Sequence, residues 1–175
     1  MIFKEKEVFQ KERPKGLTDL QRQNLTKKLA AEIIDNGWSD SDISDILLDL
    51  DFLPEWESGF ELAKELDRNI SAGRYKVDAE FIEWLDTFGF RFAETKLKNL
   101  KAWVAAHNIK PKFVKGQKLK IINKMPFFLG FFDTIYINYV DKKRAMYYVG
   151  AALGNYLNAS YNFEDVENNC EILKE

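Results

Sequence analysis

The chain has 175 residues, with 26 basic and 28 acidic side chains and a net charge near −2. Hydrophobic residues make up 46% of it and aromatic residues 14%, which supplies enough apolar surface for a core and excludes a disordered protein. A length of this order suggests one domain or two small ones. The nearly balanced charge argues against general nucleic-acid binding, which usually shows as a basic domain.

The composition and the N-terminus indicate a cytoplasmic protein. No apolar run approaches the roughly 18 residues that a membrane span needs. Residues 1–16 are charged throughout and lack the apolar stretch of a signal peptide. The single cysteine, Cys170, has no partner for an internal disulfide. We therefore expect a cytoplasmic protein that does not contact a membrane.

Residues 1–109 have the apolar spacing of about five helices. Thr18 and Gln21 form the capping-box pattern T-x-x-Q, and apolar residues then recur at helical spacing. Gly37 stands where a helix can end in the left-handed conformation that glycine favours. A first helix is therefore expected between Thr18 and Gly37.

Four further helices are expected in the same part of the chain. Ser39 with Asp42 is the predicted start of the second helix, and Pro54 fits the first turn of the third, where its missing N–H costs nothing. The fourth helix is expected to start near Asp78. Gly89 then separates it from a fifth helix that runs to about His107.

After Pro111 the apolar period changes from 3.6 to 2, which indicates strands. The run FFDTIYINY has the aromatic and β-branched residues typical of a strand, and FEDVEN suggests a short helical turn. The expected strands cover residues 118–121, 131–139, 145–149, 155–160 and 170–173. Five short strands joined by tight turns predict a small closed barrel. The predicted fold is α+β: a helical domain, residues 1–109, followed by a five-stranded antiparallel β-barrel, residues 112–173.

The order G-x-x-L-x-I, a loop, G-F-F-x-T-I, a turn, Y-Y-V and then N-F-E-D-V-E resembles the small Src-homology-type or KOW-type β-barrel modules of phage and plasmid accessory proteins. The resemblance covers residues 113–173. Its matching positions are Gly116, Leu119, Ile121, Gly130, Ile135, Tyr147, Tyr148, Val149, Phe163, Glu164 and Val166. It implies a binding module rather than an enzyme.

Negative charge is concentrated in residues 35–67, which hold eleven acidic residues and one base, Lys64. A calcium loop that starts at Asp40 would need glycine at its sixth position, where the chain has Asp45. Apolar residues keep helical spacing through the run, so we expect helices with an acidic face. Like charges on one helix face cost a few tenths of a kcal/mol per pair. Either they keep a solvated surface soluble, or their field attracts a basic partner.

On the second interpretation, the candidate protein-binding residues are the acids of this stretch and the two tryptophans within it, because tryptophan is frequent at the centres of protein interfaces. The set is Asp40, Asp42, Asp45, Asp49, Asp51, Glu55, Glu57, Trp38 and Trp56. The two tryptophans fit core positions equally well.

Positive charge is concentrated in residues 110–124, which hold six lysines and no acid and are followed by four phenylalanines. Lysines interleaved with aromatic rings suit nucleic acid, because bases stack on the rings. The candidate nucleic-acid-binding residues are Lys112, Lys115, Lys118, Lys120 and Lys124. Alternatively, the phenylalanines belong to the core and the lysines keep an edge strand from pairing with other chains.

The sequence shows no recognisable catalytic, metal-binding or cofactor-binding motif. Asp133 and Glu164 form a conceivable carboxylate pair, but nothing distinguishes them from surface charge. His107 suits the C-terminal end of a helix, and Cys170 has no base nearby in the sequence. We therefore expect no catalytic residue, no metal and no cofactor.

These features support three hypotheses. The first is a non-enzymatic inhibitor of the anti-CRISPR kind, from a phage or mobile element, that docks its acidic helical face on the basic groove of a CRISPR or other defence nuclease and blocks nucleic-acid binding. The second is an accessory nucleic-acid-binding protein that uses the lysines of the barrel. The third is an enzyme with an unrecognised carboxylate site.

Overall fold

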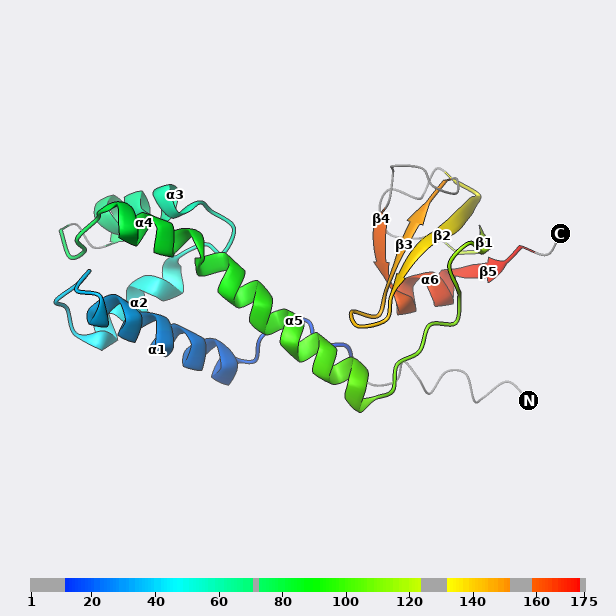
Figure 1. Ribbon diagram of the computed structural model, residues 1–175, viewed down its shortest axis with the longest axis horizontal. Helices are drawn as coiled ribbons and strands as arrows, with labels where there is room; N and C mark the ends of the chain where they lie inside the picture. The colour runs from blue at the N-terminus through cyan, green and yellow to red at the C-terminus, as the bar shows by residue number, and fades with distance from the viewer. Residues whose placement is uncertain (1–11, 71–72, 124–131, 152–158, 174–175) are drawn as a thin grey trace. The chain divides into compact units, whose positions relative to one another are not determined.

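The computed structural model describes residues 12–70, 73–123, 132–151 and 159–173 (Figure 1). Helices come first and a five-stranded antiparallel sheet follows, so the α+β class and the order of its parts are confirmed. The chain divides into two compact units. We call Lys15–Asn99 the helical unit, and residues 12–14 and 100–173 the sheet unit. The division lies within a helix, α5 (Phe88–Ala106), whereas the sequence suggested a boundary near residue 110.

Several helix ends in the helical unit lie where the sequence predicts them. Its elements are α1 (Asp19–Asp35), α2 (Ile43–Phe52), α3 (Gly59–Glu65), the π-helical turn η1 (Leu66–Ile70), α4 (Ala79–Asp86) and the first part of α5. The capping box of Thr18 and Gln21 is present, and Gly37 takes a positive φ of 69° after α1. Asp78 accepts a hydrogen bond from Phe81 N at 2.9 Å and caps α4.

The second helix starts later than predicted, at Ile43 instead of Ser39. The Ser39 side chain is buried, and its hydroxyl donates to the carbonyl of Arg74 at 3.0 Å. The serine therefore ties the turn after α1 to the segment before α4, and its oxygen accepts a hydrogen bond from Ser41 N at 3.2 Å instead of capping the helix.

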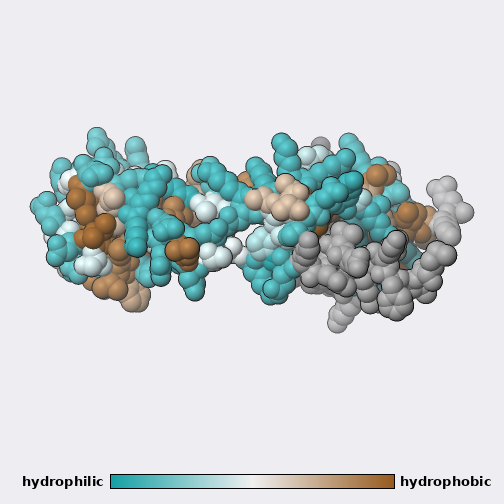
Figure 2. Space-filling view, turned by 90° about the horizontal axis from the view of Figure 1, so that it is seen from below, coloured by the Kyte–Doolittle hydropathy of each residue, from teal (hydrophilic) through white to brown (hydrophobic). Residues whose placement is uncertain are grey.

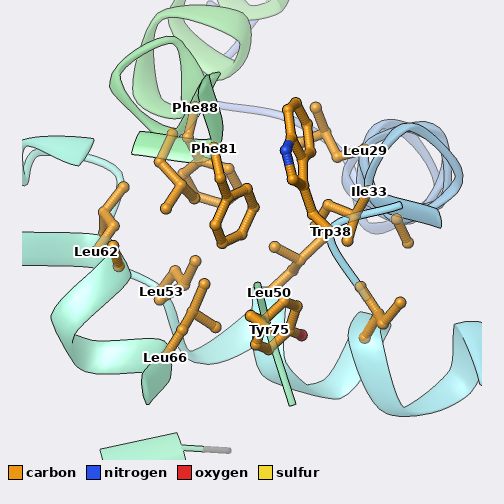
Figure 3. Close-up of a cluster of buried hydrophobic side chains, with 14 of the residues drawn as sticks. Leu29, Ile33, Trp38, Leu50, Leu53, Leu62, Leu66, Tyr75, Phe81 and Phe88 are labelled. Carbon is orange, nitrogen blue, oxygen red and sulfur yellow. The ribbon is translucent and has the colours of Figure 1, made fainter. Parts of the chain in front are cut away.

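One core of apolar side chains holds these helices together (Figure 3). Leu29 and Ile33 of α1 face this core, and Trp38 packs its ring 5.2 Å from that of Phe81 and 5.6 Å from that of Trp84. A buried aromatic cluster of this kind contributes large apolar area and favourable ring geometry. Of the two interpretations that the sequence left open for Trp38, the core position is the one observed, with 7% of its surface exposed, so it does not lie at an exposed binding surface.

Glu32 of α1 links three helices. Its carboxylate accepts a hydrogen bond from Trp84 Nε1 of α4 at 2.9 Å and another from the guanidinium of Arg91 in α5. Partial burial alone raises the pKa of Glu32, but these two hydrogen bonds and the charge of Arg91 outweigh it and hold the pKa below its ordinary value.

The sheet unit contains β1 (Lys118–Ile121), β2 (Thr134–Asp141), β3 (Met146–Gly150), β4 (Ala159–Asn162), α6 (Phe163–Asn169) and β5 (Cys170–Ile172). The strands pair in the order β4-β3-β2-β1-β5. Four of the five predicted strands and the helical turn at FEDVEN match within a few residues. The fourth predicted strand lies mostly outside the described residues, which resume at Ala159.

The prediction of a closed barrel is wrong, because β4 and β5 are the two edges of an open sheet. The reason is α6, which follows β4 directly and places Phe163 and Val166 in the same core as Leu119 and Ile135 of the sheet. A helix supplies the second layer, so the sheet buries its apolar face without closing on itself. The opposite face carries Lys118, Lys120 and other partly or fully exposed residues.

We expect Glu32→Gln to lower the free energy of unfolding by about 1 kcal/mol at neutral pH, because it weakens charge-assisted hydrogen bonds. Since the pKa of Glu32 is lowered on folding, the carboxylate stabilises the fold above the pKa of the unfolded chain, and this contribution is lost as the pH falls through the folded pKa. Urea unfolding followed by circular dichroism should show the two proteins converging in acid. Glu83→Gln, an exposed change on α4, should match the wild type at every pH; an equal loss in both variants would contradict this role of Glu32.

Candidate protein-binding site

The loop between α2 and α3 forms the centre of the candidate site. Pro54 was expected in the first turn of a helix, but it lies before α3 and ends α2 instead. A proline disfavours the helical conformation in the residue before it, and Leu53 is extended with φ −73° and ψ 132°. Leu53 is buried and anchors the loop. The chain becomes helical again only after Ser58, whose hydroxyl accepts a hydrogen bond from Glu61 N.

Two glycines allow this loop to lie close to its neighbours. A Cβ on Gly89 of α5 would lie 1.9 Å from the carbonyl oxygen of Glu55, and one on Gly59 would lie 2.1 Å from that of Ile82 in α4. Gly89 was expected to break the chain between two helices. It lies within the first turn of α5, so its role is to admit the backbone of Glu55.

Glu55 holds the loop in place through charge. Its carboxylate accepts hydrogen bonds from the guanidinium of Arg22 in α1 and from Lys96 Nζ in α5, the latter at 2.6 Å. The Glu55 side chain is only 19% exposed. Both bases next to the loop are thus engaged by one acid, and little positive charge is left for the acids around it.

A pocket of about 880 Å³ opens beside this loop. We call it the acidic pocket, and its lining residues are Arg22, Asp51, Phe52, Leu53, Pro54, Glu55, Trp56, Glu57, Glu61, Leu62, Glu65 and Lys96. Five of these are acidic, and Asp51 and Glu57 are exposed and form no ion pair with any described residue. Glu61 pairs with Lys64 at 3.1 Å on the same helix. The mouth of the pocket therefore carries net negative charge.

Two aromatic side chains stand in solvent at the same pocket. Trp56 is 82% exposed and Phe52 is 75% exposed. More widely, hydrophobic side chains gather in a band on an otherwise hydrophilic face of the helical unit (Figure 2). Large exposed apolar side chains surrounded by polar ones are typical of protein-binding surfaces, and tryptophan is enriched among the residues that dominate binding energy.

The predicted binding residues thus separate into three groups. Asp51, Glu55, Glu57 and Trp56 line the acidic pocket. Asp40 and Asp42 are exposed near the start of α2 but do not line it, and half-buried Asp45 lies 3.8 Å from Arg74. The third group, Trp38 and Asp49, is buried.

For Asp49 the expectation of an exposed acid is wrong, because only 5% of its surface is accessible. It accepts hydrogen bonds from the hydroxyl of Tyr75 at 2.8 Å and from Arg74 Nη1 at 3.0 Å. Burial, together with the hydrogen bond to Asp49 and the negative charge of that carboxylate, raises the pKa of Tyr75 well above its ordinary value, so the phenol stays protonated and donates. Asp49 is a structural residue that ties α2 to the segment before α4.

Sequence reasoning missed Phe52, Glu61 and Glu65 as members of the site. A signal for Phe52 was present, since Leu48 and Phe52 are one helical turn apart on α2 and lie off the stripe that Ile46 and Leu50 bury. Both are exposed, as an apolar pair opposite the core stripe must be. Glu61 and Glu65 join the pocket only because α3 folds back beside the loop, which no local pattern encodes.

The other candidates fall in the sheet unit. Lys112, Lys115 and Lys120 are exposed and Lys118 is half-buried, whereas Lys124 lies outside the described residues. Glu164 forms an ion pair with Arg13 at 3.2 Å, and no described contact joins it to Asp133. His107 follows the end of α5, and Cys170 is buried, which raises the pKa of its thiol to about 11.

Over the described part of the chain, no three acidic, cysteine or histidine side chains are grouped to hold a metal ion. Nor does any described helix have the length and apolar character that crossing a bilayer requires. No family model, curated protein or solved structure matches the chain.

We expect Asp49→Ala to lower the free energy of unfolding by about 2–4 kcal/mol, because Tyr75 and Arg74 lose a buried acceptor. Asp45→Ala removes a half-exposed acid from the same arginine and should cost less than about 1 kcal/mol. Urea denaturation of both proteins measures the difference. Similar losses in the two variants would show that Asp49 does not have the structural role assigned to it.

Gly89→Ala should destabilise the helical unit by about 1–3 kcal/mol even though alanine favours helices, because a methyl group cannot fit against the Glu55 carbonyl. The matched change Gly16→Ala meets no atom within 4 Å and should stay within about 0.5 kcal/mol of the wild type. Thermal unfolding of both variants tests this close approach, and a Gly89→Ala protein as stable as the wild type would contradict it.

Proposed function

We propose that the protein is a non-enzymatic binding protein whose acidic pocket docks on a basic protein surface. One observation carries the proposal: acids without an ion pair, Asp51 and Glu57, line the same pocket as two largely exposed aromatic side chains. Acids alone are common on solvated surfaces. An exposed tryptophan beside them supplies apolar area that a solubilising surface does not need.

The complementary partner has lysines and arginines around an apolar depression. Trp56 and Phe52 would enter the depression, while Asp51 and Glu57 would pair with the surrounding bases. Such charge complementarity speeds encounter and selects the partner, whereas the buried aromatic rings supply most of the affinity. Basic surfaces of this size usually belong to proteins that handle nucleic acid.

The function that follows is inhibition. A protein that occupies the basic groove of a nuclease excludes the nucleic acid that the groove would otherwise hold. In a bacterial cell this is the action of an anti-CRISPR-like inhibitor from a phage or mobile element. The mode of action needs no catalytic residue, metal or cofactor on the inhibitor.

Affinity capture from bacterial lysate at low and high salt, followed by reconstitution with the purified partner, tests the proposal. We expect capture at low salt of a nucleic-acid-binding protein, and displacement of a fluorescent oligonucleotide from it. Asp51→Lys/Glu57→Lys should weaken binding by about tenfold or more, because it reverses the charge at the mouth of the pocket. Phe52→Ala/Trp56→Ala should weaken it by about thirtyfold.

Two matched variants serve as controls. Asp35→Lys/Asp40→Lys makes the same change in net charge at exposed acids outside the pocket, and Phe90→Ala removes an exposed aromatic ring of α5. Both should bind within about threefold of the wild type if the pocket is the site. Equal loss in the pocket and control charge variants, or a captured partner that keeps its oligonucleotide, would refute the proposal.

A further inference from the structure

A second pocket, of about 690 Å³, lies in the sheet unit, and its charge is opposite to that of the acidic pocket. Its walls include Phe113, Val114 and Tyr139, and three lysines surround it: Lys110, Lys115 and Lys142. All three lysines are exposed, and none forms an ion pair with a described residue. No acidic side chain lines the pocket among the described residues.

The acids next to this pocket are occupied elsewhere. Asp141 adjoins Lys142, but its carboxylate accepts hydrogen bonds from the backbone N–H groups of Lys143 and Arg144 and lies 3.6 Å from Arg144 Nε. Glu167 accepts hydrogen bonds from Lys112 N and from the hydroxyl of Tyr147. Both carboxylates fix turns of the backbone and neither lines the pocket, so the charged side chains that line it among the described residues are all lysines.

The buried part of the apolar wall, Phe113, is held by the sheet core. Phe113 is buried, and its backbone N–H donates to the Tyr147 hydroxyl at 2.9 Å. That hydroxyl in turn donates to Glu167 at 2.6 Å. A wall held by the sheet core can present a fixed apolar surface to a ligand, which lowers the entropy that binding would lose.

An irregularity in β2 brings a second aromatic ring to the outer face of the sheet. Residues three apart on a regular strand point to opposite faces. The register shifts between Ile137 and Tyr139, so Tyr139 pairs with Tyr148, and Val140 pairs with the buried Tyr147. Tyr139 therefore faces outward, as Tyr136 does.

The result is a set of rings and ammonium groups on one sheet face and in its adjoining pocket. The rings of Tyr139 and Tyr148 are 5.6 Å apart, and Tyr139 is 56% exposed. Lys118 Nζ lies 5.6 Å from the ring centre of its strand partner Tyr136. We call the three tyrosines, Lys118 and the three lysines of the pocket the tyrosine–lysine track.

We propose that the tyrosine–lysine track binds single-stranded nucleic acid, with a base stacked on Tyr139 beside the pocket and phosphates on Lys110, Lys115 and Lys142. Apolar walls with a cationic rim select a ligand that joins flat aromatic groups to repeated negative charges, which is the chemistry of a single strand. A duplex hides the faces of its bases and offers no ring to stack on Tyr139. This inference does not depend on the acidic pocket.

The test is fluorescence anisotropy of the full chain with a labelled oligothymidylate of about 15 nucleotides and with a duplex of equal length. We expect the single strand to bind more tightly than the duplex, with an affinity that falls steeply with salt. Tyr139→Ala should weaken binding by about five- to thirtyfold through lost stacking. Tyr139→Phe keeps the ring and should retain wild-type affinity.

The contribution of charge is tested with Lys115→Glu/Lys142→Glu. This double variant should lower the affinity and reduce the slope of log affinity against log salt by at least about 1.4. Lys27→Glu/Lys28→Glu makes the same charge change at exposed lysines of α1 and should leave binding unchanged. Thermal unfolding of each variant checks that the fold is kept. Reversal of the acidic pocket by Asp51→Lys/Glu57→Lys should not weaken this binding, which separates the two sites.

Three results would overturn the inference. The first is duplex binding as tight as single-strand binding. The second is a Tyr139→Ala protein that binds like the wild type, since lysines alone would then hold any polyanion. The third is equal affinity for polyglutamate or for vesicles of anionic lipid, because neither ligand offers an aromatic base to the rings.

Discussion

The close approach between the α5 backbone and the loop after α2 is the constraint on which the acidic pocket depends. Gly89 leaves no room for a side chain beside the Glu55 carbonyl, and Arg22 and Lys96 clamp the carboxylate of the same residue. The loop is therefore fixed both by backbone contact and by charge. Because its centre is anchored through buried Leu53, the flanking Phe52 and Trp56 are held outward in solvent instead of folding into the core.

The distribution of acids around this loop explains how the helical unit tolerates its charge. Asp45 and Asp49 lie one helical turn apart on α2, and Arg74 forms an ion pair with each of them. The distances are 3.0 Å to Asp49 and 3.8 Å to Asp45. Burial of Asp49 is possible only because Tyr75 and Arg74 supply its hydrogen bonds. Asp51 and Glu57 form no ion pair with a basic side chain among the described residues. Repulsion between acids is thus relieved at the buried position on α2 and remains beside the exposed rings, where we propose that a basic partner docks.

The sequence predicted what local patterns encode. The capping box at Thr18, the start of α4 near Asp78 and the alternation around Leu119 each depend on residues within a few positions, and each is present. The burial of Asp49 could not be predicted, because its partners lie some 25 residues away along the chain. The prediction of a closed barrel was wrong for a similar reason. The described residues contain five paired strands, as predicted. Closure of the sheet, however, depends on what covers its apolar face, and here α6 packs against that face.

Segregation of charge would give each of the two proposed sites its selectivity. A basic protein surface is attracted to Asp51 and Glu57 and repelled by the lysines of the tyrosine–lysine track, whereas nucleic acid responds in the opposite way. At physiological salt such fields reach only about 8 Å, so each acts on what contacts its own rings. Discrimination therefore comes as much from repulsion of the wrong ligand as from attraction of the right one. On these two proposals a chain with net charge near −2 binds partners of either sign, which its overall composition does not predict.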